Sequence, residues 1–157
     1  MARSSVQFPD PPSRKTPAQR ALLPSPPNDA MYHTYRSDLS QVRALVLERA
    51  REAGLAEGRA NDLVLAVSEV AANTLRHTQG PGTLAIWHDA DEVVCEIRDS
   101  GTIADAQAGQ RKPLPGASGG HGLWLVRQVC DVVELTSDAS GTMIRMHMTL
   151  RPPVAGG

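Results

Sequence analysis

The sequence lacks most of the features that mark secreted, metal-binding or nucleic-acid-binding proteins. It has two cysteines in 157 residues, Cys95 and Cys130, and no zinc-ligand spacing. We expect both to be buried thiols rather than a disulfide or a metal site. Only two residues are lysine and the net charge is −1, so nothing favours a nucleic-acid or membrane surface.

Long apolar runs are also missing. No stretch has the length of a membrane span, and the start has no apolar signal core. We therefore expect a soluble, cytoplasmic protein that binds neither nucleic acid nor membrane. No internal repeat is visible, and the length suits one domain with a substantial core.

Proline is concentrated at one end of the chain. Residues 1–30 hold seven of the twelve prolines, and such a segment builds neither a helix nor a strand ladder. This segment is predicted to be a disordered arm that acts as a spacer rather than a docking peptide. The domain is expected over residues 31–150, followed by a flexible tail over 151–157.

Residues 63–77 are predicted to form the helix around which the domain is organised. Leu63, Val67, Val70 and Thr74 recur with the helical period and should face the core. Glu69 and Asn73, four positions apart, stack about 6 Å apart along the axis on another face. Taken alone, this helix favours an exposed polar row over a site, and the rest of the chain changes that balance.

The remaining pattern predicts further strands and helices in a clear order. Residues 31–36 form a strand, Ser37 caps a helix that ends near Gly54, and Asn61 caps the helix of residues 63–77, which ends at 80–82. Strands are expected over 83–88, 92–98, 132–136 and 142–150, and a helix over 123–130. Residues 102–121 have no periodicity and are predicted to be a lid.

These elements predict an α+β fold. Most strands come as hairpins, so the sheet should be mainly antiparallel, with helices on one face of a two-layer sandwich. In the strand of residues 92–98, Val93, Cys95 and Ile97 should face the core, and Glu96 and Arg98 should point outward. In the last strand Arg145 and His147 should likewise lie on the face away from the core.

Two further segments could carry chemistry. Asp99 ends a strand, just before Gly101, where it could form a turn or accept a hydrogen bond from a ligand amine. The glycines of residues 119–122 lead into a helix, whose free N–H groups suit phosphate. The glycine segment is neither a Walker A loop nor a dinucleotide fingerprint.

Taken together, these segments resemble the GHKL ATPases, whose fold is the Bergerat-type sandwich. Residues 31–150 resemble more narrowly the anti-sigma-factor serine kinases of bacteria, particularly short ATP-binding regulators of actinobacteria. The matching boxes, in chain order, are Glu69-x-x-x-Asn73, Asp99-x-Gly101, Gly120-x-Gly122-Leu123 and Gly141-Thr142.

The resemblance implies a role for each matching position. Glu69 would be the general base, acting on a protein serine or threonine hydroxyl or on water. Asn73 would hold Mg²⁺ together with triphosphate oxygens and water. Asp99 would accept a hydrogen bond from the adenine amino group. Gly101 would let the adenine ring approach the backbone, and Thr142 would support adenine through water. Phosphates would meet the remaining positions: Arg76, His77, Gly120, His121, Gly122 and Leu123.

The sequence also departs from the family in places. Ile103 replaces the second glycine of the Asp-x-Gly-x-Gly box, and the predicted lid carries Arg111 and Lys112, which could meet phosphate or be solvated. For His77 a structural hydrogen bond is as good an interpretation as a phosphate contact. No helical hairpin with a phosphoacceptor histidine precedes the domain, which argues against a complete sensor histidine kinase.

Three functions remain open from the sequence. The first is an ATP-dependent protein serine/threonine kinase in a partner-switching circuit, acting on an anti-sigma antagonist protein and binding a sigma factor. The second is a nucleotide-gated adaptor with little or no kinase activity, and the third is an α+β domain without a ligand. The resemblance also leaves a homodimer open.

Overall fold

The computed structural model describes residues 25–78, 80–101 and 121–151. Five strands form one sheet in the order β1-β2-β3-β5-β4, and every neighbouring pair is antiparallel. The elements are β1 (Met31–Tyr35), α2 (Ser40–Ala53), α3 (Glu57–His77), β2 (Gly82–His88), β3 (Glu92–Asp99), α4 (His121–Val129), β4 (Val132–Asp138) and β5 (Gly141–Thr149).

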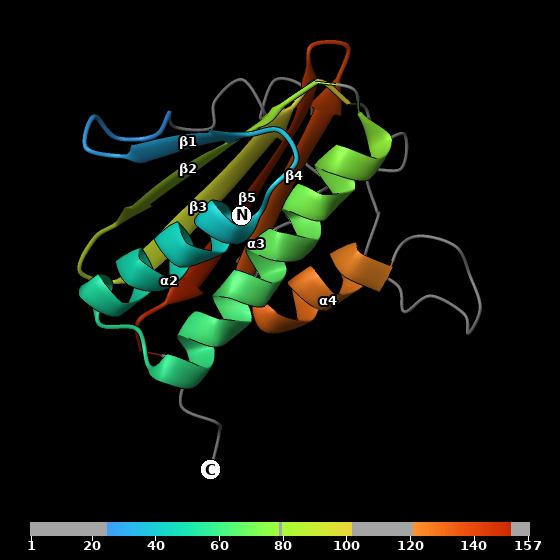
Figure 1. Cartoon of the computed structure of the whole chain (residues 1–157). Helices are drawn as coiled ribbons and strands as arrows, with labels where there is room; N and C mark the ends of the chain where they lie inside the picture. Colours follow the sequence, from blue (N-terminus) through green and yellow to red (C-terminus); the bar gives the residue numbers. More distant parts are fainter. Residues whose placement is uncertain (1–24, 79, 102–120, 152–157) are drawn as a thin grey trace, which may run out of the picture.

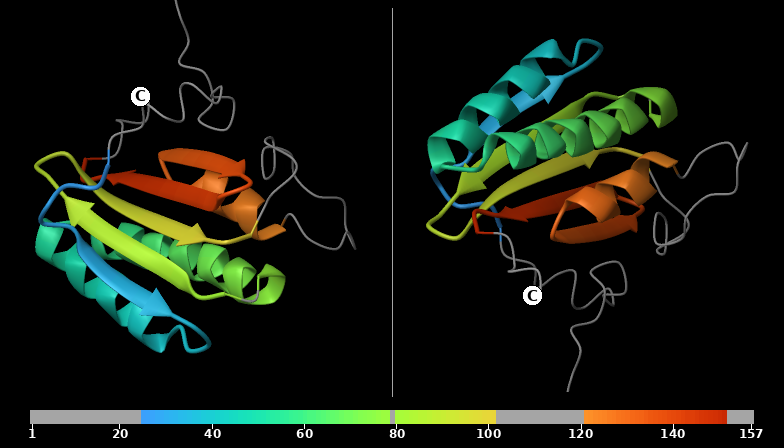
Figure 2. Two further views of the ribbon diagram at one scale, coloured as in Figure 1. Left: turned by 90° about the horizontal axis from the view of Figure 1, so that it is seen from above. Right: turned by 90° about the horizontal axis from the view of Figure 1, so that it is seen from below.

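The three described helices pack on one face of this sheet (Figures 1 and 2). The core lies between the two layers, where alternate residues of β3 and β5 meet the apolar faces of α2, α3 and α4. Burying this apolar surface is what holds the layers together. The predicted α+β class, with a mainly antiparallel sheet and helices on one face, is confirmed.

Helix α3 carries the apolar row that the sequence predicted. Leu63, Val67, Val70 and Thr74 are at most 1 % exposed, so this row faces the sheet. The predicted start was wrong: α3 begins at Glu57, and Asn61 lies within it. The extra turn forms because Ala60 also continues the buried row and Glu57 places a carboxylate in the first turn. The helix ends at His77, before the glycines, because Thr78 is extended.

The start of α2 also differs from the prediction. Ser37 is not the cap: the helix begins at Ser40, and Leu39 occupies the N-cap position without a side-chain bond. Instead, Asp38 accepts hydrogen bonds from both the backbone N–H and the hydroxyl of Ser40, each at 2.9 Å. The carboxylate of Asp38, the residue before the N-cap position, therefore takes the place of a capping side chain. The predicted end is confirmed, since Gly54 closes the helix with a φ of +94°.

The sheet face opposite the helices holds a buried ion pair. Arg145 donates to Oε2 of Glu96 at 2.9 and 2.6 Å, and Arg98 donates to Oε1 at 2.6 Å. Glu96 is 1 % exposed and Arg145 is 3 % exposed, and the guanidinium lies 5.3 Å from the ring centroid of Trp87. The predicted face was right, but Glu96 and Arg145 are buried there because they pair with each other.

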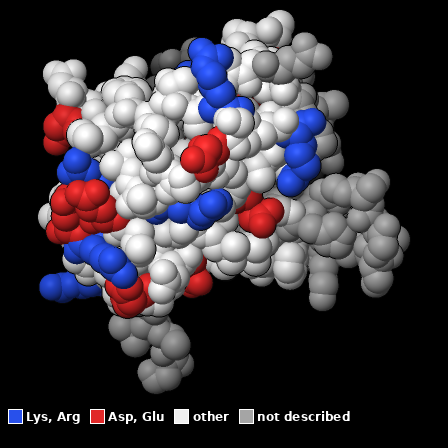
Figure 3. Space-filling model, in the orientation of Figure 1, with Lys and Arg blue, Asp and Glu red and all other residues white. Residues whose placement is uncertain are grey.

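Other expectations meet the structure more simply. Cys95 and Cys130 are free, buried thiols, and burial raises the pKa of Cys130 to about 12. Within the described ranges, no helix has the length and apolar character needed to cross a bilayer. On the face shown in Figure 3, basic and acidic side chains are interspersed. The proposed arm falls mostly, and the tail almost wholly, outside the described residues.

Candidate functional site

The acid and the amide on α3 lie against the first turn of α4. A Cβ atom on Gly122 would lie 2.9 Å from Oε2 of Glu69 and 3.8 Å from Nδ2 of Asn73. Only a glycine allows this approach without moving the carboxylate. The N-terminus of α4, with its free N–H groups and positive dipole end, therefore adjoins both side chains.

Asp99 lies next to the same stretch of α3. Its Oδ2 accepts a hydrogen bond from the hydroxyl of Thr74 at 2.8 Å, and its Oδ1 accepts one from the backbone N–H of Gly101 at 2.8 Å. Because Thr74 follows Asn73 directly, α3 joins the carboxylate at the end of β3 to the Glu69–Asn73 pair. The sequence placed these groups in separate segments, and the structure brings them together.

Thr142 ties the start of β5 to the end of β3. Its hydroxyl donates to the carbonyl oxygen of Gly101 at 2.8 Å and pairs with the hydroxyl of Ser137 at 2.8 Å. The preceding residue, Gly141, has a φ of +132°, and a Cβ there would lie 2.3 Å from the carbonyl oxygen of Asp99. The backbone of β5 therefore packs directly on the backbone that carries Asp99.

A cation already contacts the amide oxygen of Asn73. The guanidinium of Arg76, one turn further along α3, donates a hydrogen bond to Oδ1 of Asn73. This contact shows that the amide oxygen is oriented to accept from a positive group. Among the described residues, no three His, Cys, Asp or Glu side chains form a metal cluster. A metal at Asn73 would therefore need ligands from a nucleotide and water.

Most of the predicted positions converge at this end of the sheet. The structure brings together Glu69, Asn73, Arg76, Asp99, Gly101, Gly122 and Thr142, and Leu123 is buried in α4. For His77 and His121 the backbone belongs to α3 and α4, but their side chains lie outside the description. The remaining predicted positions, Gly120, Ile103, Arg111 and Lys112, also lie outside the described residues.

Two residues of the site were missed at the sequence level. Thr74 was assigned to the apolar row, and its hydroxyl was overlooked because threonine fits that row by size. Tyr35 was assigned to a strand, yet its hydroxyl donates to Oγ1 of Thr74 at 3.0 Å. Thr74 offered a signal, since a hydroxyl on a buried helix face requires a partner. Nothing local pointed to Tyr35, which lies 39 positions away.

The fold and the site define a domain of the nucleotide-binding ATPase type. The chain belongs to the histidine kinase-like ATPase domain family, whose model matches residues 34–148. This range begins within β1, ends within β5 and includes every described residue of the site. The chain is therefore an ATP-binding domain of the histidine kinase-like class. Membership of this family supports an ATP-using enzyme of the kinase type.

A solved structure has the same architecture. The Acinetobacter baumannii histidine kinase AdeS is similar over 77 % of this chain and 68 % of its own, with a TM-score of 0.51 and 15 % identity. At that identity the likeness shows the fold alone. A search of curated proteins finds no match.

Proposed function

We propose that this domain is an ATP-dependent protein serine/threonine kinase of the anti-sigma type, which regulates transcription by partner switching. One observation carries the proposal. The start of α4 packs on Glu69 and Asn73 of α3, and Thr74, the residue after Asn73 on α3, donates a hydrogen bond to Asp99. The carboxylate of Glu69, the amide of Asn73, the N-terminus of α4 and the carboxylate of Asp99 thus lie at one end of the sheet.

Asn73 and Glu69 have different parts in this proposal. Asn73 would hold Mg²⁺ through Oδ1, the atom that Arg76 now contacts, and the metal would neutralise phosphate charge when bound. Glu69 would take the proton of a serine or threonine hydroxyl of the protein substrate. The hydroxyl oxygen then forms the bond to the γ-phosphorus, the bond from the γ-phosphorus to the bridging oxygen breaks, and ADP leaves.

The other residues would bind the nucleotide. Asp99 would accept a hydrogen bond from the adenine amino group, which guanine lacks at that position, while Thr142 fixes the Gly101 backbone beside it. Gly122 would let phosphates approach the N–H groups at the start of α4, and Arg76 would turn from Asn73 to phosphate. Gly120, His77, His121 and Leu123 keep the phosphate roles that the resemblance gives them.

The partner in this proposal is an anti-sigma antagonist protein with a phosphorylatable serine or threonine, and a sigma factor is the regulated partner. The family match supports the ATP chemistry, and the resemblance of residues 31–150 supports the circuit. The intact Glu69–Asn73 pair favours catalysis over binding alone, because a pure adaptor has no use for a base beside the phosphates.

Phosphotransfer from labelled ATP to a panel of such antagonists tests the proposal. We expect transfer by the parent and a loss of at least about a hundredfold in Glu69→Ala, which is the lower end of the usual range for removing a general base. Glu57→Ala, at the exposed start of the same helix, is the matched control and should keep full transfer.

Two results would contradict the kinase. One is no transfer to any antagonist, and the other is a Glu69→Ala variant that behaves like the parent. Tight Mg-ATP binding that changes partner affinity without product would establish the nucleotide-gated adaptor instead. Thermal unfolding that millimolar Mg-ATP leaves unchanged would remove both, because a bound ligand stabilises by about 2.7 kcal/mol at a hundredfold excess over Kd.

A further inference from the structure

A chain of buried hydroxyl groups leads from the edge of the sheet to Asp99. Tyr35, at the end of β1, and Thr74, on α3, are 2 % and 1 % exposed. The hydroxyl of Tyr35 donates to Oγ1 of Thr74, and the hydroxyl of Thr74 donates to Oδ2 of Asp99. Three elements that are distant in sequence therefore meet at one carboxylate.

The direction of these bonds follows from the chemistry of the groups. A carboxylate only accepts hydrogen bonds, so the single proton of Thr74 goes to Asp99 at 2.8 Å rather than to the carbonyl of Val70 at 3.5 Å. Thr74 must then accept from Tyr35. Burial, aided by the charge of Asp99 and opposed by the bond to Thr74, raises the pKa of Tyr35 to about 12, so the phenol keeps its proton at neutral pH.

The packing around Tyr35 holds the ring in the position that this chain requires. Gly82 on β2 lies directly opposite Tyr35 in the sheet. A Cβ at Gly82 would lie 2.3 Å from both Cζ and the hydroxyl oxygen of Tyr35, so the ring occupies the space that a side chain would fill. The ring therefore crosses over β2 toward α3, and its hydroxyl reaches Thr74.

Both oxygens of Asp99 are thus supplied with a donor from the protein. Gly101 fixes Oδ1 through its backbone, and Thr74 fixes Oδ2 through a side chain that Tyr35 holds in turn. Each oxygen still has a free lone pair. A carboxylate held in this way presents its remaining acceptor sites in one fixed direction, which is what selecting an amino group requires.

We propose that Tyr35 and Thr74 are positioning residues that set the base selectivity of the nucleotide site by orienting Asp99. This inference rests on the proposed contact between Asp99 and the adenine amino group. The two residues act through Asp99 and do not themselves contact the nucleotide in this proposal. Loss of either hydroxyl should lower the ratio of ATP affinity to GTP affinity in a chain that still folds.

The test measures Kd for Mg-ATP and Mg-GTP by calorimetry on the full chain. Thr74→Val keeps the shape and removes the hydroxyl, whereas Thr74→Ser keeps the hydroxyl. We expect Thr74→Val and Tyr35→Phe to lower the ATP-to-GTP affinity ratio about three- to tenfold, the size of one hydrogen bond, and Thr74→Ser to keep the parent ratio. Tyr32→Phe, on the exposed side of the same strand, should change nothing.

Coupling gives a second readout. If Tyr35 acts only through Thr74, the double variant should show the selectivity of Thr74→Val alone, because the effects of residues in one network do not add. Should Thr74→Val fail to fold, Tyr35→Phe and Thr74→Ser decide the question. A Tyr35→Phe variant with the parent ratio would then overturn the proposal.

Asp99→Asn separates this inference from the proposed function. If the parent does not prefer ATP, or if Asp99→Asn keeps the parent preference, the role of Asp99 is wrong and the inference falls with it. If Asp99→Asn abolishes the preference but Thr74→Val and Tyr35→Phe retain it, the role of Asp99 stands and the positioning role is refuted.

Discussion

At the scale of single residues, glycine decides how closely the parts of the site approach. Gly122 brings α4 against Glu69, and Gly141 brings β5 against the backbone of Asp99. The two contacts differ in what stands opposite: at Gly122 it is the end of a side chain, and at Gly141 it is a carbonyl oxygen of the main chain. Substitutions at the two positions should therefore have different effects.

Gly122→Ala should impair the site while sparing the fold. The added methyl group would lie 2.9 Å from Oε2 of Glu69, and the carboxylate can move aside. A base displaced by about 1 Å loses up to about a hundredfold in rate, so we expect reduced phosphotransfer with an unchanged unfolding midpoint. Gly58→Ala, in the first turn of α3 with nothing within 4 Å, is the control. Full activity in Gly122→Ala would contradict the assignment of this contact.

Gly141→Ala should instead destabilise the fold. Its φ of +132° is unfavourable for other residues, and the new Cβ would lie 2.3 Å from the carbonyl oxygen of Asp99, which cannot move aside. Gly54 has a positive φ with open space around it, so Gly54→Ala measures the conformational cost alone, about 1–3 kcal/mol. Urea denaturation should show a clearly larger loss for Gly141→Ala, and equal losses would disprove the steric contribution.

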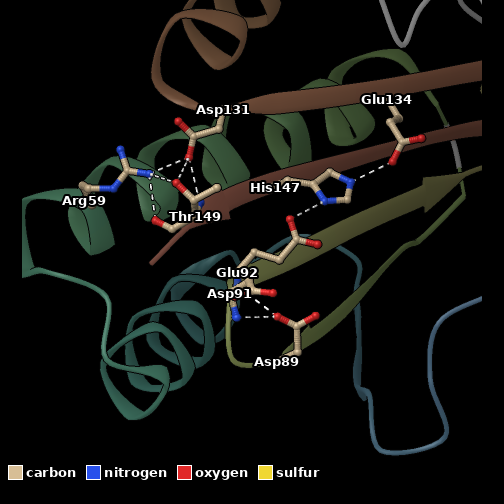
Figure 4. Close-up of polar contacts among 8 residues, drawn as sticks. All are labelled: Arg59, Asp89, Asp91, Glu92, Asp131, Glu134, His147 and Thr149. Atoms are coloured by element: carbon tan, nitrogen blue, oxygen red, sulfur yellow. Dashed lines mark hydrogen bonds and ion pairs between the residues drawn. The ribbon is translucent and has the colours of Figure 1, made fainter. Parts of the chain in front are cut away.

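At the scale of elements, side-chain bridges connect segments that the backbone alone would leave loosely joined. Arg59, in the early part of α3, donates to Asp131 and to the carbonyl of Thr149, and Asp131 also accepts the N–H of Thr149 (Figure 4). This bridge fixes the far end of α3 against β5. The helix that carries Glu69 and Asn73 is thereby held near both ends, because Thr74, close to its C-terminus, is hydrogen-bonded to Asp99 of β3.

His147 joins three strands and should make stability depend on pH. Its ring lies between Glu92 of β3 and Glu134 of β4 (Figure 4). Nδ1 is 3.0 Å from Oε1 of Glu92, and Nε2 is 2.7 Å from Oε1 of Glu134. Burial lowers the pKa of His147, but the bonds and charges of Glu134 and Glu92 together raise it above its usual value of 6.5. The folded state therefore binds the proton more tightly than the unfolded chain does.

The sign of the dependence follows from this difference. The stabilisation is fully present below the unfolded pKa of about 6.5 and is lost as pH rises through the higher pKa of the folded state. We expect the unfolding free energy of the parent, relative to His147→Gln, to be greatest in mildly acidic solution and to fall toward alkaline pH. Urea denaturation across this range is the measurement, and a pH-independent difference would refute it.

At the scale of the whole molecule, local pattern predicted more of the fold than of the site. The apolar period of α3 and the alternation in β3 and β5 are repeated over many residues, so the layers and the antiparallel sheet could be predicted. The helix starts could not be predicted in this way, because each depends on a single residue. Asp38 takes the place of the expected cap of α2, and the burial of Ala60 extends α3 beyond its expected start. The pairing of Glu96 with Arg145 also depends on strand order, which the pattern of each strand does not contain.

The site shows the same division. Glu69, Asn73, Asp99 and Gly122 could be named because their residue types and spacing match a known set of boxes. Their meeting with Tyr35 could not be predicted, since it depends on β1 lying beside β2 and on a ring crossing Gly82. The hydroxyl of Thr74 was masked by an apolar pattern that it satisfies with its methyl group.

Strand β1 pairs with β2 alone among the described strands, yet its last residue, Tyr35, is hydrogen-bonded to Thr74 at the end of the sheet where we propose that the nucleotide binds. Tyr32, on the same strand, is 59 % exposed. A fluorophore attached at position 32 would thus sit in solvent on an element mechanically connected to Asp99. Such a label would lie outside the proposed site, so a change in its emission on addition of Mg-ATP would report binding without a group in the site itself.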